Sequence, residues 1–249
     1  MLDRSVFLRP IAHRGLHDAA RGIIENSGPA FEAALAKGYG IECDLRPAAD
    51  GTPIVFHDES LARLVDAPGR VADYAPSALT RLTYRGTTAR VATLADLLAL
   101  VDGRVPILVE VKSEWTPPDA GFLRAIAEQA AVYRGPLALM SFDPSVMTAL
   151  KRLAPTIARG IVSGVYEGDG WWGDKVDADR AYRLTHLLES GPVEPAFFAY
   201  HVNALPTPVT RFVREGLGLP LFAWTVRSEQ NRAVAAKWAD APIFEGFEA

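Results

Sequence analysis

Residues 40–45 read Gly-Ile-Glu-Cys-Asp-Leu and residues 107–112 read Ile-Leu-Val-Glu-Val-Lys, and these two stretches decide the fold class. Both are short apolar runs that charged residues interrupt only at alternate positions near their ends. Short, largely apolar runs of this kind are typical of strands that are covered on both faces, as in a parallel sheet.

Similar runs recur along the whole chain and alternate with amphipathic stretches, which predicts parallel strands joined by crossover helices. The expected strands cover residues 7–13, 40–45, 107–112, 137–142, 157–162, 197–202, 221–226 and 243–247. The expected helices cover residues 29–37, 94–101, 122–133, 145–153, 179–188, 209–215 and 230–238.

Eight such strands form either an open doubly wound sheet or a closed barrel. The glycine-rich phosphate loop that an open sheet commonly carries does not follow the first strand. We therefore expect an α/β fold, the (β/α)8 TIM barrel. The segment from about residue 53 to 91 is too long for a simple loop, so we expect it to be a small insertion between the second and third barrel strands.

Composition restricts the classes of partner. The 249 residues are 49% hydrophobic and 22% charged, which suits one domain over residues 1–249 with a single core. A net charge of -4 and a pI near 5.8 argue against a nucleic-acid partner. No apolar run approaches the roughly 18 residues of a membrane span, so we expect no stable membrane insertion and, by default, a cytoplasmic protein.

Charged residues occupy alternate positions near the ends of two of these strands. Glu42 and Asp44 are two residues apart, as are Glu110 and Lys112, so each pair projects from one face of its strand. Cys43 then faces the opposite way and is expected to be a packed thiol. Three carboxylates from adjacent strand ends suit Mg2+ or Ca2+. The alternative is that they are solvated or paired with neighbouring basic residues.

Two histidines end strand-like runs. His13 closes Ile-Ala-His-Arg-Gly, and His57 closes Val-Phe-His-Asp. Imidazole titrates near neutral pH, so two histidines beside a metal suit general acid–base catalysis. A single histidine at a strand end is more commonly a structural hydrogen-bonding residue. Lys112 also admits a Schiff-base role, but an adjacent Glu110 favours its charged form.

Several of these residues lie in motifs whose order and spacing resemble the glycerophosphodiester phosphodiesterase family. The motifs of the first half are His13-Arg14-Gly15, Glu25-Asn26-Ser27, Glu42-x-Asp44, Asp50-Gly51 with His57-Asp58, and Glu110-x-Lys112. Those of the second half are Ser141-Phe142-Asp143 and Trp224-Thr225-Val226. The resemblance spans nearly the whole chain and implies metal-dependent hydrolysis of glycerophosphodiesters to glycerol 3-phosphate and an alcohol.

The resemblance also implies roles for individual residues. The implied ligands of one divalent cation, Mg2+ or Ca2+, are Glu42, Asp44 and Glu110. The implied catalytic residues are the acid–base pair His13 and His57 and the phosphate-neutralising cations Arg14 and Lys112. The implied neighbours of the small-molecule substrate are Glu25, Asn26, Phe142 and Trp224. For Phe142 and Trp224, core packing is an equally good interpretation.

The chain departs from the family pattern at two motifs. Ile24 and Ser27 replace the proline and threonine of the P-E-N-T motif. The C-terminal stretch at residues 242–247 replaces a T-D-x-P type motif, which puts details of the substrate pocket in doubt.

Two questions stay open at the level of sequence. The irregular segment 164–174 carries Tyr166, Trp171 and Trp172, which either pack onto the protein, enclose a choline-like ammonium or touch a membrane. The rival functions are a lysophospholipase D-like or phospholipase C-like activity on lipids and, in a different class, a non-catalytic barrel that binds phosphorylated ligands.

Overall fold

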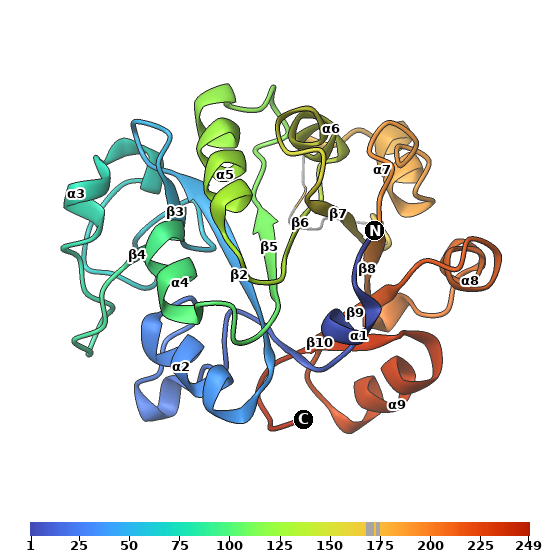
Figure 1. The fold of residues 1–249 in the computed structure, drawn as a ribbon, viewed down its shortest axis with the longest axis horizontal. Coiled ribbons are helices and arrows are strands. Elements are labelled where there is room, and N and C mark those ends of the chain that lie inside the picture. Colours follow the sequence, from blue (N-terminus) through green and yellow to red (C-terminus); the bar gives the residue numbers. More distant parts are fainter. Residues whose placement is uncertain (168–171, 173–174) are drawn as a thin grey trace.

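A closed barrel of eight parallel strands forms the centre of the part of the chain that the computed structural model describes, residues 1–167, 172 and 175–249. Neighbours around the ring follow the order β1-β2-β5-β6-β7-β8-β9-β10, and β1 closes it by pairing with both β2 and β10. Figure 1 shows helices arranged around this ring. The TIM-barrel prediction is therefore confirmed.

The barrel strands agree with the predicted ranges to within a few residues at most ends. Their bounds are β1 (Ile11–Ala12), β2 (Gly40–Pro47), β5 (Ile107–Val111), β6 (Leu137–Ser141), β7 (Ala158–Ser163), β8 (Phe197–His201), β9 (Leu221–Val226) and β10 (Ala241–Phe244). The last strand thus ends before residue 245, whereas the sequence predicted a strand to residue 247.

Helices follow the strands and cover the outside of the barrel. They are α2 (Gly28–Lys37), α4 (Leu94–Val101), α5 (Ala120–Val132), α6 (Pro144–Leu153), α7 (Ala178–Thr185), α8 (Pro208–Arg211) with the π-helical turn η5 (Phe212–Gly216), and α9 (Glu229–Trp238). Short 3-10 turns are η1 (Ala19–Arg21) and η4 (Val202–Ala204). Thr93 and Ser228 accept hydrogen bonds from backbone N–H groups at the starts of α4 and α9, as N-caps do.

Alternation along each strand divides the apolar residues between two layers. Ile41, Cys43 and Val109 face the helices and pack with residues of the outer layer. Leu108 and Phe222 face inward and fill the barrel interior. This arrangement leaves the carboxyl ends of the strands for polar side chains, as is usual in this fold.

The N-terminal segment differs from the prediction of a strand over residues 7–13. Residues Arg4–Phe7 form a short helix, α1, and only Ile11–Ala12 form the strand. Asp3 caps this helix through the N–H of Ser5. Phe7 packs with residues of the barrel interior, so α1 lies across the amino end of the barrel and covers its apolar filling.

The insertion between β2 and β5 extends the sheet outward. Its elements are β3 (Pro53–Val55), η2 (Val71–Asp73), α3 (Pro76–Leu79) and β4 (Ala92–Thr93). The strand β3 pairs antiparallel with both β2 and β4, and Figure 1 shows this region on one side of the barrel. Phe56 and Tyr84 belong to its separate apolar cluster.

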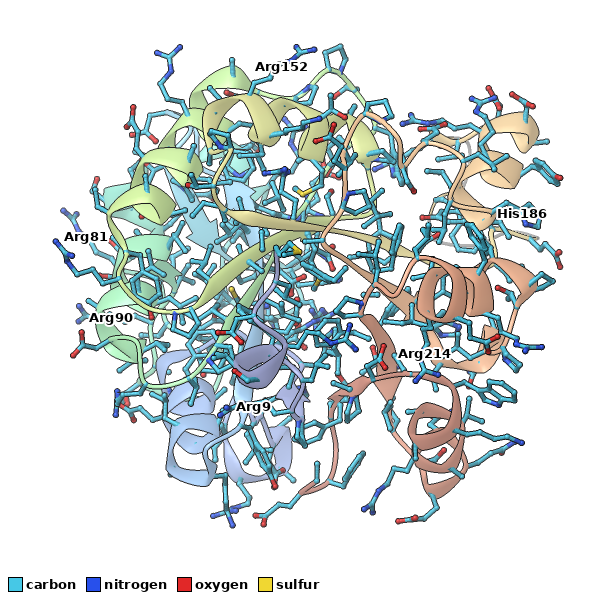
Figure 2. All side chains as sticks on the ribbon, turned by 45° about the vertical axis from the view of Figure 1, so that its right-hand side comes forward. Arg9, Arg81, Arg90, Arg152, His186 and Arg214 are labelled. Atoms are coloured by element: carbon cyan, nitrogen blue, oxygen red, sulfur yellow. The ribbon has the colours of Figure 1, made fainter. Side chains whose placement is uncertain are left out.

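The outer surface carries charged side chains. In Figure 2, Arg81, Arg90 and Arg152 point outward from the region around the barrel. In the described residues, no helix is long and apolar enough to cross a membrane.

Candidate active site

The three predicted carboxylates lie together inside the barrel mouth. Asp44 of β2 and Glu110 of β5 are direct partners in the parallel register, and Glu42 precedes Asp44 on the same face. One oxygen from each of the three carboxylates lies within 4.8 Å of the others. Glu42 and Asp44 are each 1% exposed and Glu110 is 7% exposed, so the cluster is shielded from water.

Two cations counter this charge. The Lys112 Nζ lies 2.7 Å from an Asp44 oxygen and 2.5 Å from a Glu110 oxygen. The Arg14 Nε lies 3.3 Å from Asp44, and the Arg14 backbone N–H donates to Glu42 at 3.0 Å. Three carboxylates against two cations leave one excess negative charge when all five groups are ionised.

Burial acts on the two strand β2 carboxyls in the same way, but their charged neighbours separate their pKa values. Burial, reinforced by the charges of Asp44 and Glu110, raises the pKa of Glu42 well above its ordinary value. Burial also raises the pKa of Asp44, but Lys112, His57 and Arg14 outweigh it and hold that pKa well below its ordinary value.

The cluster fits a divalent cation. Among the described residues, the buried Glu42 Oε1 has no hydrogen-bond partner. An unpaired buried carboxylate oxygen is costly unless a cation or a proton satisfies it. The three ligands are hard oxygen donors, and the local excess of charge is negative, so the donor set suits Mg2+ or Ca2+.

The first histidine follows β1 at a sharp turn. Arg14 and Gly15 both adopt positive φ values, of 57° and 79°. A Cβ on Gly15 would lie 2.8 Å from a backbone atom of Ala30, so only glycine fits there. This turn leaves His13 8% exposed, with its Nε2 3.9 Å from a Glu42 oxygen. Burial lowers the pKa of His13, although Glu245 opposes that shift.

The second histidine enters the site from the insertion. His57 lies two residues after β3 and its carbonyl oxygen accepts a hydrogen bond from Arg46 Nε at 2.6 Å. Its Nδ1 is 2.7 Å from an Asp58 carboxylate oxygen, and Arg63 pairs with the same carboxylate. The structure therefore brings His57 to the same cavity as His13 although the two come from different strands.

Glu25 and Asn26 contact other residues of the site. They are absent from the described residues that line the cavity. Glu25 accepts from Arg14 at 2.7 Å and from Arg63 at 2.7 Å. Asn26 is fully buried and donates to Asp44 at 2.8 Å. We therefore expect these residues to hold Arg14 and Asp44 in place, and their place beside the substrate stays a prediction.

A cavity of about 470 Å³ opens above the carboxylates. Phe142 and Trp224 line it, and their rings meet edge to face with centroids 5.1 Å apart. Trp224 Nε1 donates to the Ser163 carbonyl oxygen at 3.0 Å, which fixes the indole. Both aromatic residues therefore line the cavity, and their contact with the substrate stays a prediction. The other lining side chains include His13, Arg14, Arg46, His57, Glu110, Lys112, Glu114, Trp115, Lys175 and Arg227.

Sequence reasoning missed several polar residues at the mouth. Glu114 accepts from Arg46 at 2.5 Å and from Lys175 at 2.6 Å, and it thereby joins the loop after β5 to the one after β7. Glu245 lies beside His13. In the sequence, its one distinguishing feature is that it is an acidic residue near the end of the last strand-like run. Arg63 carried no signal, because nothing in its local sequence distinguishes it from an ordinary exposed arginine.

The remaining histidines lie away from the carboxylates or serve other contacts. His186 is exposed, and Figure 2 shows it at the outer edge beside α7. The His201 ring packs on Trp224, with centroids 4.9 Å apart. His17 Nε2 lies 3.5 Å from Glu245. Cys43 is buried and faces the helices, as predicted.

The aromatic segment packs onto the protein where it is described. Tyr166 is 7% exposed and packs with Val176, Ala181 and Leu184. Its ring centroid lies 5.0 Å from that of Trp172. Trp171, which the sequence grouped with them, lies outside the described residues.

Comparisons with known proteins agree on one family. The model of the glycerophosphoryl diester phosphodiesterase family matches residues 13–245. A glycerophosphodiester phosphodiesterase of Caldanaerobacter subterraneus subsp. tengcongensis is 25% identical over 89% of this chain and 86% of its own. Glycerophosphodiester phosphodiesterase 1 of Bos taurus is 27% identical over 90% of this chain and 73% of its own.

Solved structures share the fold. An Oleispira antarctica phosphodiesterase, solved with the product sn-glycerol-3-phosphate, superposes with a TM-score of 0.72 and 22% identity, covering 95% of this chain and 92% of that one. A Thermotoga maritima glycerophosphodiester phosphodiesterase gives a TM-score of 0.70 and 21% identity, covering 95% and 93%. Each likeness supports the barrel.

Proposed function

The chain belongs to the glycerophosphoryl diester phosphodiesterase family, and from this premise we propose that it hydrolyses glycerophosphodiesters to glycerol 3-phosphate and an alcohol. The observation that carries the proposal is the cluster of three buried carboxylates, of which Glu110 lines the same cavity as two histidines, an arginine and a lysine. A protein that only binds phosphorylated ligands has little need for two histidines beside a site for a cation.

We propose that Glu42, Asp44 and Glu110 hold one divalent cation, Mg2+ or Ca2+. The unpaired Glu42 oxygen and the excess negative charge of the cluster support this ligand set. When bound, the cation supplies Lewis-acid stabilisation of the charge on the phosphoryl oxygens.

The charged side chains of the chain act on the phosphoryl group. Arg14 and Lys112 are partly buried, pair with the carboxylates and line the cavity, so their positive ends are fixed before substrate arrives. Fixed cations stabilise charge as it develops, with little reorganisation.

The two histidines divide the proton transfers. We assign His13 as the base that takes a proton from the attacking hydroxyl, which is water or the neighbouring 2-hydroxyl of the glycerol. Attack by the 2-hydroxyl gives a cyclic phosphate and releases the alcohol, and water must then open the ring to give glycerol 3-phosphate. We assign His57 as the acid that gives a proton to the oxygen of the departing alcohol as its bond to phosphorus breaks. Each proton taken from the nucleophile is matched by one delivered to the leaving group.

The insertion belongs to the same functional unit in this proposal. It carries His57, and β3 joins it to β2 of the barrel by antiparallel pairing. We therefore propose that residues 1–249 act as one domain.

Release of glycerol 3-phosphate from a panel of glycerophosphodiesters tests the function. The panel is measured with Mg2+, with Ca2+ and with a chelator, and His13→Ala serves as the inactive control. We expect release that requires both a cation and His13. Release by the wild type that persists in chelator, or no release from any member of the panel, contradicts the proposal. In the second case the lysophospholipids form the next panel.

The role of His57 has a separate test. An alcohol leaving group needs a proton, whereas an aryl oxide with a low pKa leaves without one. His57→Ala is therefore expected to lose activity on alkyl diesters and to retain most activity on a nitrophenyl diester. Equal losses on the two substrates contradict the assignment.

A further inference from the structure

Glu245 is the first residue after β10, and its carboxylate meets the ring of His13 across 232 positions of sequence. The distance from His13 Nδ1 to Glu245 Oε2 is 2.5 Å, so the two groups are within hydrogen-bonding distance. The Glu245 N–H donates to the Val226 carbonyl oxygen at 3.1 Å, which fixes the backbone that presents the carboxylate.

The contact decides which nitrogen of the neutral imidazole carries the proton. A carboxylate accepts hydrogen bonds, so Nδ1 is the donor. The other nitrogen, Nε2, then holds a lone pair and lies 3.9 Å from a Glu42 oxygen, on the side of the carboxylate cluster. A base that acts on a hydroxyl at this cluster needs its lone pair on Nε2.

We propose that Glu245 is a positioning residue that holds His13 in the Nδ1–H tautomer and so leaves Nε2 free to accept the proton of the attacking hydroxyl. The catalytic consequence rests on the proposed function, whereas the tautomer itself does not. His57 has a similar partner: its Nδ1 lies 2.7 Å from an Asp58 carboxylate oxygen, so a carboxylate meets the Nδ1 of each of the two histidines.

Arg227 makes the inference sharply testable. Its Nε donates to the other oxygen of Glu245, Oε1, at 2.5 Å. Arginine has only donors, so in Glu245→Gln the amide oxygen must face Arg227 and the amide NH2 must face His13. The amide then donates to Nδ1, which forces the proton of the neutral ring onto Nε2. The substitution keeps the shape of the side chain and inverts the tautomer.

Nitrogen NMR on protein labelled with 15N-histidine reads the tautomer directly, at a pH where the five histidines are neutral. The His13 signals are identified by their loss in His13→Asn. We expect a protonated Nδ1 and an unprotonated Nε2 in the wild type and in Glu245→Asp, and the reverse in Glu245→Gln. A wild-type ring protonated on Nε2, or the same tautomer in all three proteins, overturns the inference.

Kinetics supply the second measurement. We expect Glu245→Gln to lower kcat by a factor of about 100 or more, because the wrong tautomer in a histidine–carboxylate pair costs up to about 10⁴ in a well-known hydrolase. KM and the cation concentration for half-maximal activity stay near wild type. Glu248→Gln, whose carboxylate pairs with Lys37 on the surface, is the matched control and keeps full activity.

The two measurements separate failure of this inference from failure of the proposed function. If the wild type is inactive on every diester but shows the Nδ1–H tautomer, the proposed function is refuted. The inference that Glu245 orients the His13 ring then still stands. If the wild type is active and Glu245→Gln has the same kcat, the positioning role of Glu245 is refuted. The proposed function then still stands.

Discussion

Glu42→Gln is expected to change stability in opposite senses with and without a divalent cation. In chelator, the wild type holds a buried carboxylate whose ionisation is opposed by burial and by Asp44 and Glu110. Glutamine has nearly the same shape, and its amide oxygen can keep the hydrogen bond from the Arg14 N–H. We therefore expect the melting temperature of the variant in chelator to equal or exceed that of the wild type.

With the cation present, the order reverses. A ligand at 100 times its Kd stabilises the folded state by about 2.7 kcal/mol. For a chain of this size, about 1 kcal/mol shifts the Tm by roughly 2–4 °C, so the wild type gains about 5–11 °C. If the variant binds the cation about 100-fold more weakly, then at the same concentration it gains less than about 2 °C.

Thermal unfolding in chelator and in a concentration series of Mg2+ or Ca2+ measures both effects. Glu32→Gln on the exposed face of α2 is the matched control and should show the full wild-type gain. A Glu42→Gln protein that keeps the wild-type gain, or one that is clearly less stable in chelator, refutes this description of the cluster.

Three other predictions follow from the same contacts. Lys112→Met leaves the two carboxylates it joins without their ammonium, so in chelator it should lower the free energy of unfolding by about 3–5 kcal/mol, measured by denaturant titration. Phe142→Ala removes one half of an aromatic pair worth about 0.5–1.5 kcal/mol, and the KM for the diester should rise by about 2- to 10-fold with kcat changed less. Burial raises the pKa of Glu25 and of Asp58, but hydrogen bonds and charges, including those of Arg63, outweigh it and lower both pKa values. Carboxyls of lowered pKa stabilise the fold above their unfolded pKa values, near 4, and lose that contribution as the pH falls further. The free energy of unfolding of Arg63→Gln should therefore fall less than that of the wild type between pH 5 and about pH 2. The same fall in both proteins would contradict this prediction.

The strands and helices were largely predictable because their signals are local. The runs at residues 40–45 and 107–112 show burial on both faces, and Thr93 shows where a helix begins. The helix Arg4–Phe7 was not predicted, because it has only four residues and its apolar residues continue into a stretch that resembles a strand; its packing on the barrel interior is a tertiary contact. Local pattern does not reveal such a tertiary effect.

The residues of the candidate site divide in the same way. Glu42, Asp44 and Glu110 were predictable, because strand alternation alone places them on one face at one end of the barrel. Arg63 carried no signal and Glu245 only that of an acidic residue in the last strand stretch, because their partners lie far away in sequence and are reached only when the barrel closes and the insertion folds over it.

The most direct test of the central claim is a crystal structure with Mn2+, as a stand-in for Mg2+, and glycerol 3-phosphate, in which anomalous scattering locates the ion. We predict one ion in the cavity bound by oxygens of Glu42, Asp44 and Glu110, with the phosphate of the product between it and the two histidines. An ion bound away from these three carboxylates, or no ion at a concentration that supports activity, would contradict the claim.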